Sequence, residues 1–262
     1  MPDQMTTRFL RRAAAAALAT VVLLISASAA AQQYQDADAL MAAVDARPEP
    51  SSTQATLSMT ISTASGQRLT REMQMWGVGD ERRLIKFTAP ADIAGSGFLT
   101  IEHADGSEER LVYLPALGRV RRIAGGQGGD SFFGSDFSYQ DITGIDPEDY
   151  DHTLLSVGDG PVYLVEAIPT AASESSYERL LIEVQEATLV PTRIEYYQAG
   201  ELSKVLTVSD VSEIAGYLVA GQRRMESLKG GSSSGSTVIV QTGVTFDEQL
   251  PDELFTERYL SR

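Results

Sequence analysis

Apolar and polar residues alternate with a period of two along most of the chain. Leu57, Met59 and Ile61, for example, are separated by the polar residues Ser58 and Thr60. Successive side chains of a β-strand point to opposite faces, so this period predicts strands with one buried face. The strands predicted in this way cover residues 57–61, 73–75, 82–87, 98–103, 110–114, 119–123, 162–168, 179–184, 192–197, 203–208, 217–225 and 237–246.

Helical patterns are few and lie near the ends of the chain. Residues 36–47 predict one helix, with Asp36 or Asp38 as its N-cap. Residues 251–255 predict a short helical turn that begins at a proline. The pattern therefore favours a mainly β protein without a second, helical layer.

Many strands without a helical layer must close into a barrel, split into a sandwich or curl around something. A single strongly curved antiparallel sheet is the simplest of these arrangements. No fixed-period repeat appears, and residues 230–236 are the one candidate for a linker. We therefore expect residues 32–262 to form a single β domain.

The first residues have the composition of an export signal. Three arginines precede an apolar stretch at 13–25, and small residues follow through Ala31. This order predicts a cleaved signal peptide over residues 1–31, with a mature chain that begins at Ala30 or Gln32. The alternatives are an uncleaved anchor or a buried helix. Export would place the mature protein in the periplasm.

Composition and charge exclude or disfavour several kinds of site and partner. The chain has no cysteine, which excludes disulfides, thiolate metal ligands, a cysteine nucleophile and lipidation at an N-terminal cysteine. Its formal net charge is −15, so nucleic acid is an unfavourable partner. The same charge opposes loose adsorption to anionic membranes, and contact with lipid is expected to require a specific site.

Motifs for catalysis are largely missing from the sequence. His103 and His152 lie in unrelated contexts without metal-site spacing. There is no serine-hydrolase elbow, no phosphate-binding loop and no dinucleotide fingerprint. The acidic pairs at 108–109 and 148–149 leave an enzyme that uses two carboxylates as an alternative, although solvated turns explain them better. We therefore expect no enzyme, no cofactor and no metal site.

A glycine-rich stretch at 125–130 matches one copy of a calcium-binding β-helix repeat. Such sites form between stacked copies, so a single copy favours a flexible loop. The residues just before it, 113–123, predict two strands joined by a tight turn, with Arg119 and Arg121 on one face. These two arginines are candidates to bind an anionic headgroup, or else to form ion pairs with Asp136, Asp141 or other carboxylates of this acidic protein.

Aromatic residues are concentrated between 131 and 141. Phe132, Phe133, Phe137 and Tyr139 lie within eight residues of one another. They form either a plug at one end of the core or a mobile apolar lid over a cavity.

Several segments together resemble a known family across nearly the whole mature chain. They are MW at 75–76, LIKFTAP at 84–90, GSGFL at 95–99, YLPALGRVRRI at 113–123, GSDFSY at 134–139 and FTERYL at 255–260. In these segments the chain resembles the bacterial outer-membrane lipoprotein-sorting protein family, relatives of the periplasmic lipoprotein carriers with a LolA-like fold. The resemblance implies a half-open antiparallel β-barrel with helices on its concave side and an apolar cavity for acyl chains.

The residues expected to line this cavity or its lid are apolar and large. They are Met75, Trp76, Phe87, Phe98, Phe132, Phe133 and Phe137. Flexible methionines suit a pocket that accepts more than one chain shape, although an ordinary core has the same pattern.

The sequence is compatible with three functions. The first is a carrier of lipid or lipoprotein acyl chains between an inner-membrane transporter and an outer-membrane acceptor, as the resemblance implies. The second is an accessory scaffold that docks on an inner-membrane exporter and fills its cavity with its own side chains. The third is an enzyme that uses a carboxylate pair.

Overall fold

The computed structural model describes residues 33–157 and 161–262. The expected signal peptide lies outside these residues. Residues Asp36–Arg262 form one structural unit, and all elements below belong to it.

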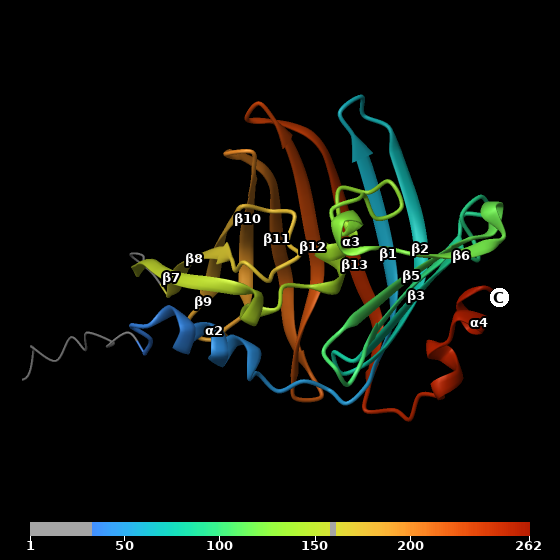
Figure 1. Cartoon of the computed structure of the whole chain (residues 1–262), viewed down its shortest axis with the longest axis horizontal. Coiled ribbons are helices and arrows are strands. Elements are labelled where there is room, and N and C mark those ends of the chain that lie inside the picture. The colour runs from blue at the N-terminus through green and yellow to red at the C-terminus, as the bar shows by residue number, and fades with distance from the viewer. Residues whose placement is uncertain (1–32, 158–160) are drawn as a thin grey trace, which may run out of the picture. The chain divides into compact units, whose positions relative to one another are not determined.

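Thirteen strands form one antiparallel sheet within the described ranges (Figure 1). They are β1 (Thr53–Thr63), β2 (Arg68–Val78), β3 (Arg82–Ala89), β4 (Gly97–Glu102), β5 (Glu108–Leu114), β6 (Arg119–Arg122), β7 (Tyr150–Val157), β8 (Val162–Pro169), β9 (Arg179–Gln185), β10 (Pro191–Gln198), β11 (Glu201–Ile214), β12 (Tyr217–Lys229) and β13 (Ser232–Phe246). Their order is β6-β5-β4-β3-β2-β1-β13-β12-β11-β10-β9-β8-β7. The first and last strands of the chain thus pair in the middle, and β6 and β7 are left as edges. The prediction of a mainly β protein built on one open antiparallel sheet is confirmed.

The strand pairing fixes which residues share a face. Met59 on β1 lies opposite Ile239 on β13, which lies opposite Arg223 on β12. In the other direction Leu57 lies opposite Met73 on β2, which lies opposite Phe87 on β3. We call the face that carries these residues the inner face. Alternation places Trp76, Leu84 and Leu99 on the opposite, outer face.

The helical elements of the described residues are short. They are α2 (Ala37–Asp45), η1 (Pro115–Leu117), η2 (Gly125–Gln127), α3 (Tyr139–Thr143), η3 (Pro147–Asp149), η4 (Asp252–Phe255) and α4 (Glu257–Leu260). Helix α2 begins where predicted, because the Asp36 carboxylate accepts a hydrogen bond from the Ala39 amide at 3.2 Å. It packs against β7 with Leu40, Met41 and Val44 buried.

Figure 1 shows the two ends of the sheet turning toward the same side, with α3 between them. The resemblance implied helices on this concave side, and α3 lies there. The C-terminal elements η4 and α4 lie on the other side of the sheet. Phe255 and Leu260 pack on the outer face against Leu84, Leu99 and Leu111.

One expectation about a connection is corrected by the pairing. The candidate linker at 230–236 is a hairpin, since Lys229 pairs with Ser232 and strand β13 begins there. Gly230 and Gly231 form its turn, with φ of 57° and 76°, values that glycine adopts without steric cost. Strand β7 and helix α3 were not predicted at all.

Candidate functional site

A segment from Asp130 to Gly144, here called the crossing segment, runs over the inner face and contains α3. Ser138 caps α3 by accepting a hydrogen bond from the Asp141 amide, and the Asp141 carboxylate accepts one from the Ser138 amide at 2.7 Å. This reciprocal capping box explains why a serine and an aspartate three residues apart end the loop and start a helix.

Aromatic rings of the crossing segment pack on the inner face of β3 and β4. The Phe132 ring lies 6.0 Å from that of Phe87 and 5.6 Å from that of Phe98, measured between centroids. Phe133 lies 4.5 Å from Phe87, and Tyr139 lies 5.2 Å from Phe98. Such tilted and edge-on pairs stabilise a core beyond the area that they bury. The rings therefore fill this part of the inner face, and we call the group of Phe132, Phe133 and Tyr139 the plug.

Polar contacts fasten the crossing segment to β11 and to the residues before β9. The Asp141 side chain is 1% exposed; it accepts a hydrogen bond from the Tyr177 hydroxyl at 2.7 Å and pairs with Lys204 Nζ at 3.1 Å. Burial, together with the neighbouring Asp141 carboxylate, raises the pKa of Tyr177 above its ordinary value. Charge-assisted bonds of this kind hold a loop strongly when they are buried.

Further contacts join the crossing segment to β2, β3 and β13. Arg71 donates to the Phe133 carbonyl, and Arg83 donates to the carbonyls of Ile142 at 2.9 Å and Thr143 at 3.2 Å. The Thr237 hydroxyl donates to the Asp136 carboxylate at 2.7 Å. The segment is therefore tied to both halves of the sheet.

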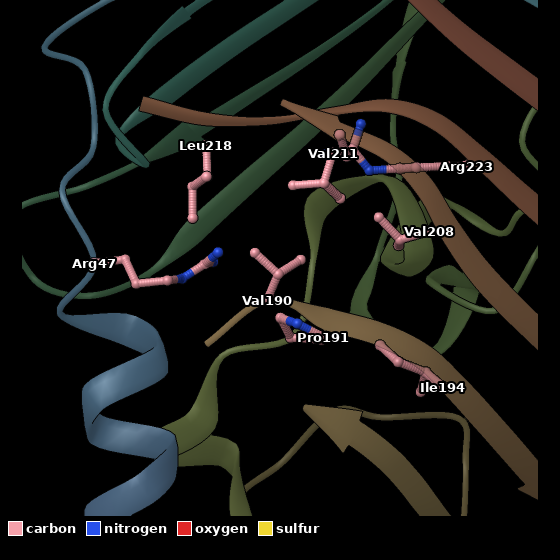
Figure 2. Close-up of a pocket in the computed structure, with 9 residues that line it drawn as sticks. Arg47, Val190, Pro191, Ile194, Val208, Val211, Leu218 and Arg223 are labelled. Carbon is pink, nitrogen blue, oxygen red and sulfur yellow. The ribbon is translucent and has the colours of Figure 1, made fainter. Parts of the chain in front are cut away.

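Beyond the plug, the inner face holds a cavity of about 210 Å³. Its wall consists of aliphatic side chains from β10, β11 and β12 and from the residue before β10, with two arginines. These residues are Arg47, Val190, Pro191, Ile194, Val208, Val211, Leu218, Ala220 and Arg223. Figure 2 shows the two guanidinium groups entering from opposite sides, Arg47 from just after α2 and Arg223 from β12.

A distortion of β11 brings more apolar residues to the cavity than strict alternation would. Val208 and Val211 are three residues apart, yet both line it. Asp210 between them has a φ of 54°, a left-handed conformation that is uncommon outside glycine and interrupts the alternation. Gly221 lies opposite, where a Cβ atom would be 2.9 Å from the Asp210 carbonyl oxygen. A strand glycine here allows the close approach of the two backbones.

The two arginines are held in unfavourable surroundings for a charge. Burial lowers the pKa of Arg223, and the positive charge of Arg83 lowers it further. Burial also lowers the pKa of Arg47, against the opposing effect of Glu49 and Asp45. Within residues 33–157 and 161–262, neither guanidinium has a carboxylate at ion-pairing distance. Arg223 Nη1 donates a long hydrogen bond to the Gln241 amide oxygen, at 3.5 Å.

The sequence-predicted residues lie around the plug rather than the cavity. Phe87, Phe98, Phe132 and Phe137 are buried, and Phe133 is partly buried. Met75 is half-buried on the inner face, opposite Ile85. The assignment of Trp76 to the cavity is corrected: its alternation in β2 places it on the outer face, against the cluster of Leu84, Leu99 and Leu260.

Arg119 and Arg121 do share a face of β6, and both are exposed. In the part of the chain that the structure describes, neither arginine lies within ion-pairing distance of Asp136 or Asp141; Asp141 pairs with Lys204, and Asp136 accepts from the Thr237 hydroxyl. Neither lines the cavity.

Arg47 and Arg223 were missed by the sequence reasoning. One signal was available for Arg223, which interrupts the apolar inner-face positions of a predicted strand just before the buried Met225.

In the described part of the chain, no helix has the length and apolar character needed to cross a membrane. The same residues contain no group of three or more histidine, aspartate or glutamate side chains arranged to hold a metal ion.

The chain is similar in sequence and fold to several proteins of known structure. A family model described as "Uncharacterized protein" matches residues 79–262. A DUF1329 family protein from Desulfovibrio piger is 29% identical, with a TM-score of 0.77 over 85% of this chain and 97% of that one. A domain from Vibrio parahaemolyticus, described as an outer membrane lipoprotein-sorting protein, is 28% identical, with a TM-score of 0.78 over 86% and 98%.

A LolA superfamily protein from Nitrosomonas europaea has the same fold at 22% identity, with a TM-score of 0.67 over 84% of this chain and 96% of that one. No curated protein matches by sequence.

Proposed function

This chain belongs to the DUF1329 family, with the fold of LolA superfamily proteins, and from that premise we propose that it is a periplasmic carrier that binds lipid acyl chains on its inner face. The observation that supports the proposal is the cavity on the inner face, whose wall combines aliphatic side chains of β10, β11 and β12 with Arg223 and with Arg47, which follows α2. The protein acts as a binding protein and not as an enzyme. Its acyl chains come from lipid or lipoprotein, and an inner-membrane transporter and an outer-membrane acceptor are its partners.

The energetics of lipid transfer support a cavity of this kind. Each methylene moved from an apolar environment into water costs about 0.8 kcal/mol, so a long chain cannot cross an aqueous space unaided. Ligand pockets usually measure about 300–1,000 Å³, whereas this cavity measures about 210 Å³. It holds part of an acyl chain, and the remainder lies along Leu218, which is 40% exposed at its edge.

A second candidate is the accessory scaffold that docks on an inner-membrane exporter. The aromatic plug favours it, because Phe87, Phe98 and Phe132 fill the other half of the inner face with the protein's own side chains. A scaffold needs no bound lipid, and the two functions therefore differ in a measurable way.

Native mass spectrometry of the mature protein, purified from periplasm without detergent, separates them. We expect stoichiometric lipid, which extraction and lipid analysis would identify. A protein that carries no lipid and takes up no fluorescent fatty acid would overturn the carrier function and favour the scaffold.

A matched pair of variants locates the binding site. Ala220→Phe places a ring in the cavity, whereas Ala104→Phe adds the same ring at an exposed turn between β4 and β5. We expect Ala220→Phe to weaken uptake of the fluorescent fatty acid at least tenfold and Ala104→Phe to leave it unchanged. Equal uptake by both variants would exclude the cavity as the site.

A further inference from the structure

Arg223 brings a positive charge into the cavity wall, and among the residues that the structure describes no carboxylate lies at ion-pairing distance from it. It lies opposite Val208 and Ile239 in the sheet and points into the cavity (Figure 2). Burial lowers the pKa of Arg223, and the like charge of Arg83 lowers it further. A buried charge without a counter-ion is costly, and a bound anion would remove that cost.

Arg47 faces the same space from the opposite side. Its Nε donates to the Val44 carbonyl at 2.8 Å, which fixes the side chain at the end of α2. An arginine has five N–H donors, so the terminal nitrogens remain available to a ligand. Two guanidiniums that enter one cavity from different elements are suited to a carboxylate or phosphate, whose oxygens accept paired hydrogen bonds.

The wall between the arginines restricts the ligand further. The side chains of Val190, Val208 and Val211 offer no hydrogen bond to a free inorganic anion, and a neutral lipid would leave the charge of Arg223 without an anionic partner in the cavity. A molecule with an anionic head and an aliphatic chain satisfies both parts of the cavity.

We propose that this cavity selects amphiphiles with a single carboxylate or phosphate head, which Arg223 and Arg47 bind while the chain contacts the valines. The inference rests on the proposed lipid-binding function and adds the chemical class of the head to it. Arg119 and Arg121 do not supply this contact, because they lie exposed on β6, outside the cavity, where water and salt screen their charge.

Three probes with the same chain test the selection in calorimetric titrations. Dodecanoate and dodecyl phosphate carry the two anionic heads, and dodecanol is the neutral reference. We expect the anionic probes to bind at least tenfold more tightly than dodecanol. Acetate and inorganic phosphate, which have no chain, are expected to bind at least a hundredfold more weakly than the corresponding amphiphiles.

Variants assign the preference to the arginines. Arg223→Gln keeps much of the side chain's volume and removes its charge, and we expect it to weaken anionic probes about 10–100-fold while dodecanol binds as before. Arg47→Gln is expected to act in the same direction, and Arg223→Lys to restore part of the preference through its charge. Arg258→Gln removes one exposed charge from α4 and serves as the matched control.

The possible failures are distinguishable. Failure of all three amphiphiles to bind would overturn the proposed function itself. Equal affinity for all three would leave lipid binding intact and overturn the selection. Inorganic phosphate that bound as tightly as dodecyl phosphate would also overturn the selection. So would a preference that was lost in Arg119→Gln and Arg121→Gln but kept in Arg223→Gln. Should Arg223→Gln not fold, an undiminished preference in Arg47→Gln would overturn it equally.

Discussion

At the scale of single residues, the inner face combines apolar packing with a few buried polar groups that hold the crossing segment in place. Asp141 organises one such group, since it completes the capping box of α3, accepts a hydrogen bond from the Tyr177 hydroxyl and pairs with Lys204. The last two contacts fasten the crossing segment to β11 and to the residues before β9, so the segment's position depends on groups that are distant in sequence. Buried networks of this kind specify one arrangement because leaving any member unpaired is costly.

The raised pKa of Tyr177 predicts a specific loss of stability at alkaline pH. An unfolded tyrosine ionises near its ordinary pKa of 10.0, whereas burial and Asp141 keep Tyr177 protonated above that pH in the folded protein. The folded state then binds more protons than the unfolded state, so the free energy of unfolding falls as pH rises above about 10, by up to about 1.4 kcal/mol per pH unit.

Tyr177→Phe removes this contribution. We expect the variant to be less stable than wild type at pH 8, because Asp141 loses a donor, and to lose stability less steeply from pH 10 upward. Urea unfolding at a series of pH values measures both effects. The control is Tyr259→Phe, at a tyrosine on α4 that lies outside this network. Parallel pH profiles for wild type and Tyr177→Phe would contradict the prediction.

At the scale of elements, the distorted pairing of β11 and β12 shapes the cavity. The left-handed Asp210 faces Gly221, and the two backbones approach closely enough to exclude a side chain. Because this distortion turns both Val208 and Val211 toward the cavity, the local backbone conformation and the ligand site depend on each other.

Gly221→Ala should therefore be destabilising. Its Cβ atom would lie 2.9 Å from the Asp210 carbonyl oxygen, so the strands must shift, at a cost of about 1–3 kcal/mol. The control is Gly126→Ala, where a Cβ atom meets nothing within 4 Å. Chemical unfolding measures both variants, and equal stabilities would contradict the close approach. Fatty acid uptake by Gly221→Ala is expected to fall as well, since the cavity wall moves.

The sequence predicted most elements and missed those whose pattern is set by distant partners. The alternation of Leu57, Met59 and Ile61 is local and predicted β1 correctly. Strand β7 has apolar residues at adjacent positions, Leu154 and Leu155, where a bulge interrupts its pairing with β8, so no alternation marks it. Helix α3 is five residues long and depends on contacts with Lys204 and Tyr177, which no local pattern shows.

The candidate site was the harder part to predict. The concentration of aromatic residues between 131 and 141 is plain in the sequence, but it does not tell a filled plug from the lining of a cavity. Arg47, Val190 and Arg223 converge from three separate regions of the chain, and only the strand order brings them together. Trp76 was assigned to the wrong face, the same face as its neighbour Met75. Adjacent residues of a strand point to opposite faces, so both cannot line the same cavity.

At the scale of the whole Asp36–Arg262 unit, the sheet has two apolar faces with different tasks. The inner face carries the plug and the cavity, and the outer face carries the C-terminal cluster of Leu84, Leu99, Leu111, Phe255 and Leu260. Lys86 holds the C-terminal end of this cluster in place, because its Nζ donates a hydrogen bond to the Leu260 carbonyl at 2.6 Å. Stability and ligand binding can then be perturbed separately.

Phe255→Ala tests this separation. Phe255 is 5% exposed and its ring lies under the Arg82 guanidinium, 4.9 Å from the ring centroid. Its removal leaves a hole in the outer cluster and should lower the free energy of unfolding by about 3–5 kcal/mol. Under conditions where the variant remains folded, we expect its affinity for a fluorescent fatty acid to stay within twofold of wild type, because the cavity lies on the other face. Ala220→Phe should show the reverse, with weakened uptake and a smaller change in stability. A Phe255→Ala protein that is folded by circular dichroism and yet fails to bind would mean that the C-terminal cluster sets the shape of the cavity through the sheet, and that the two faces are coupled.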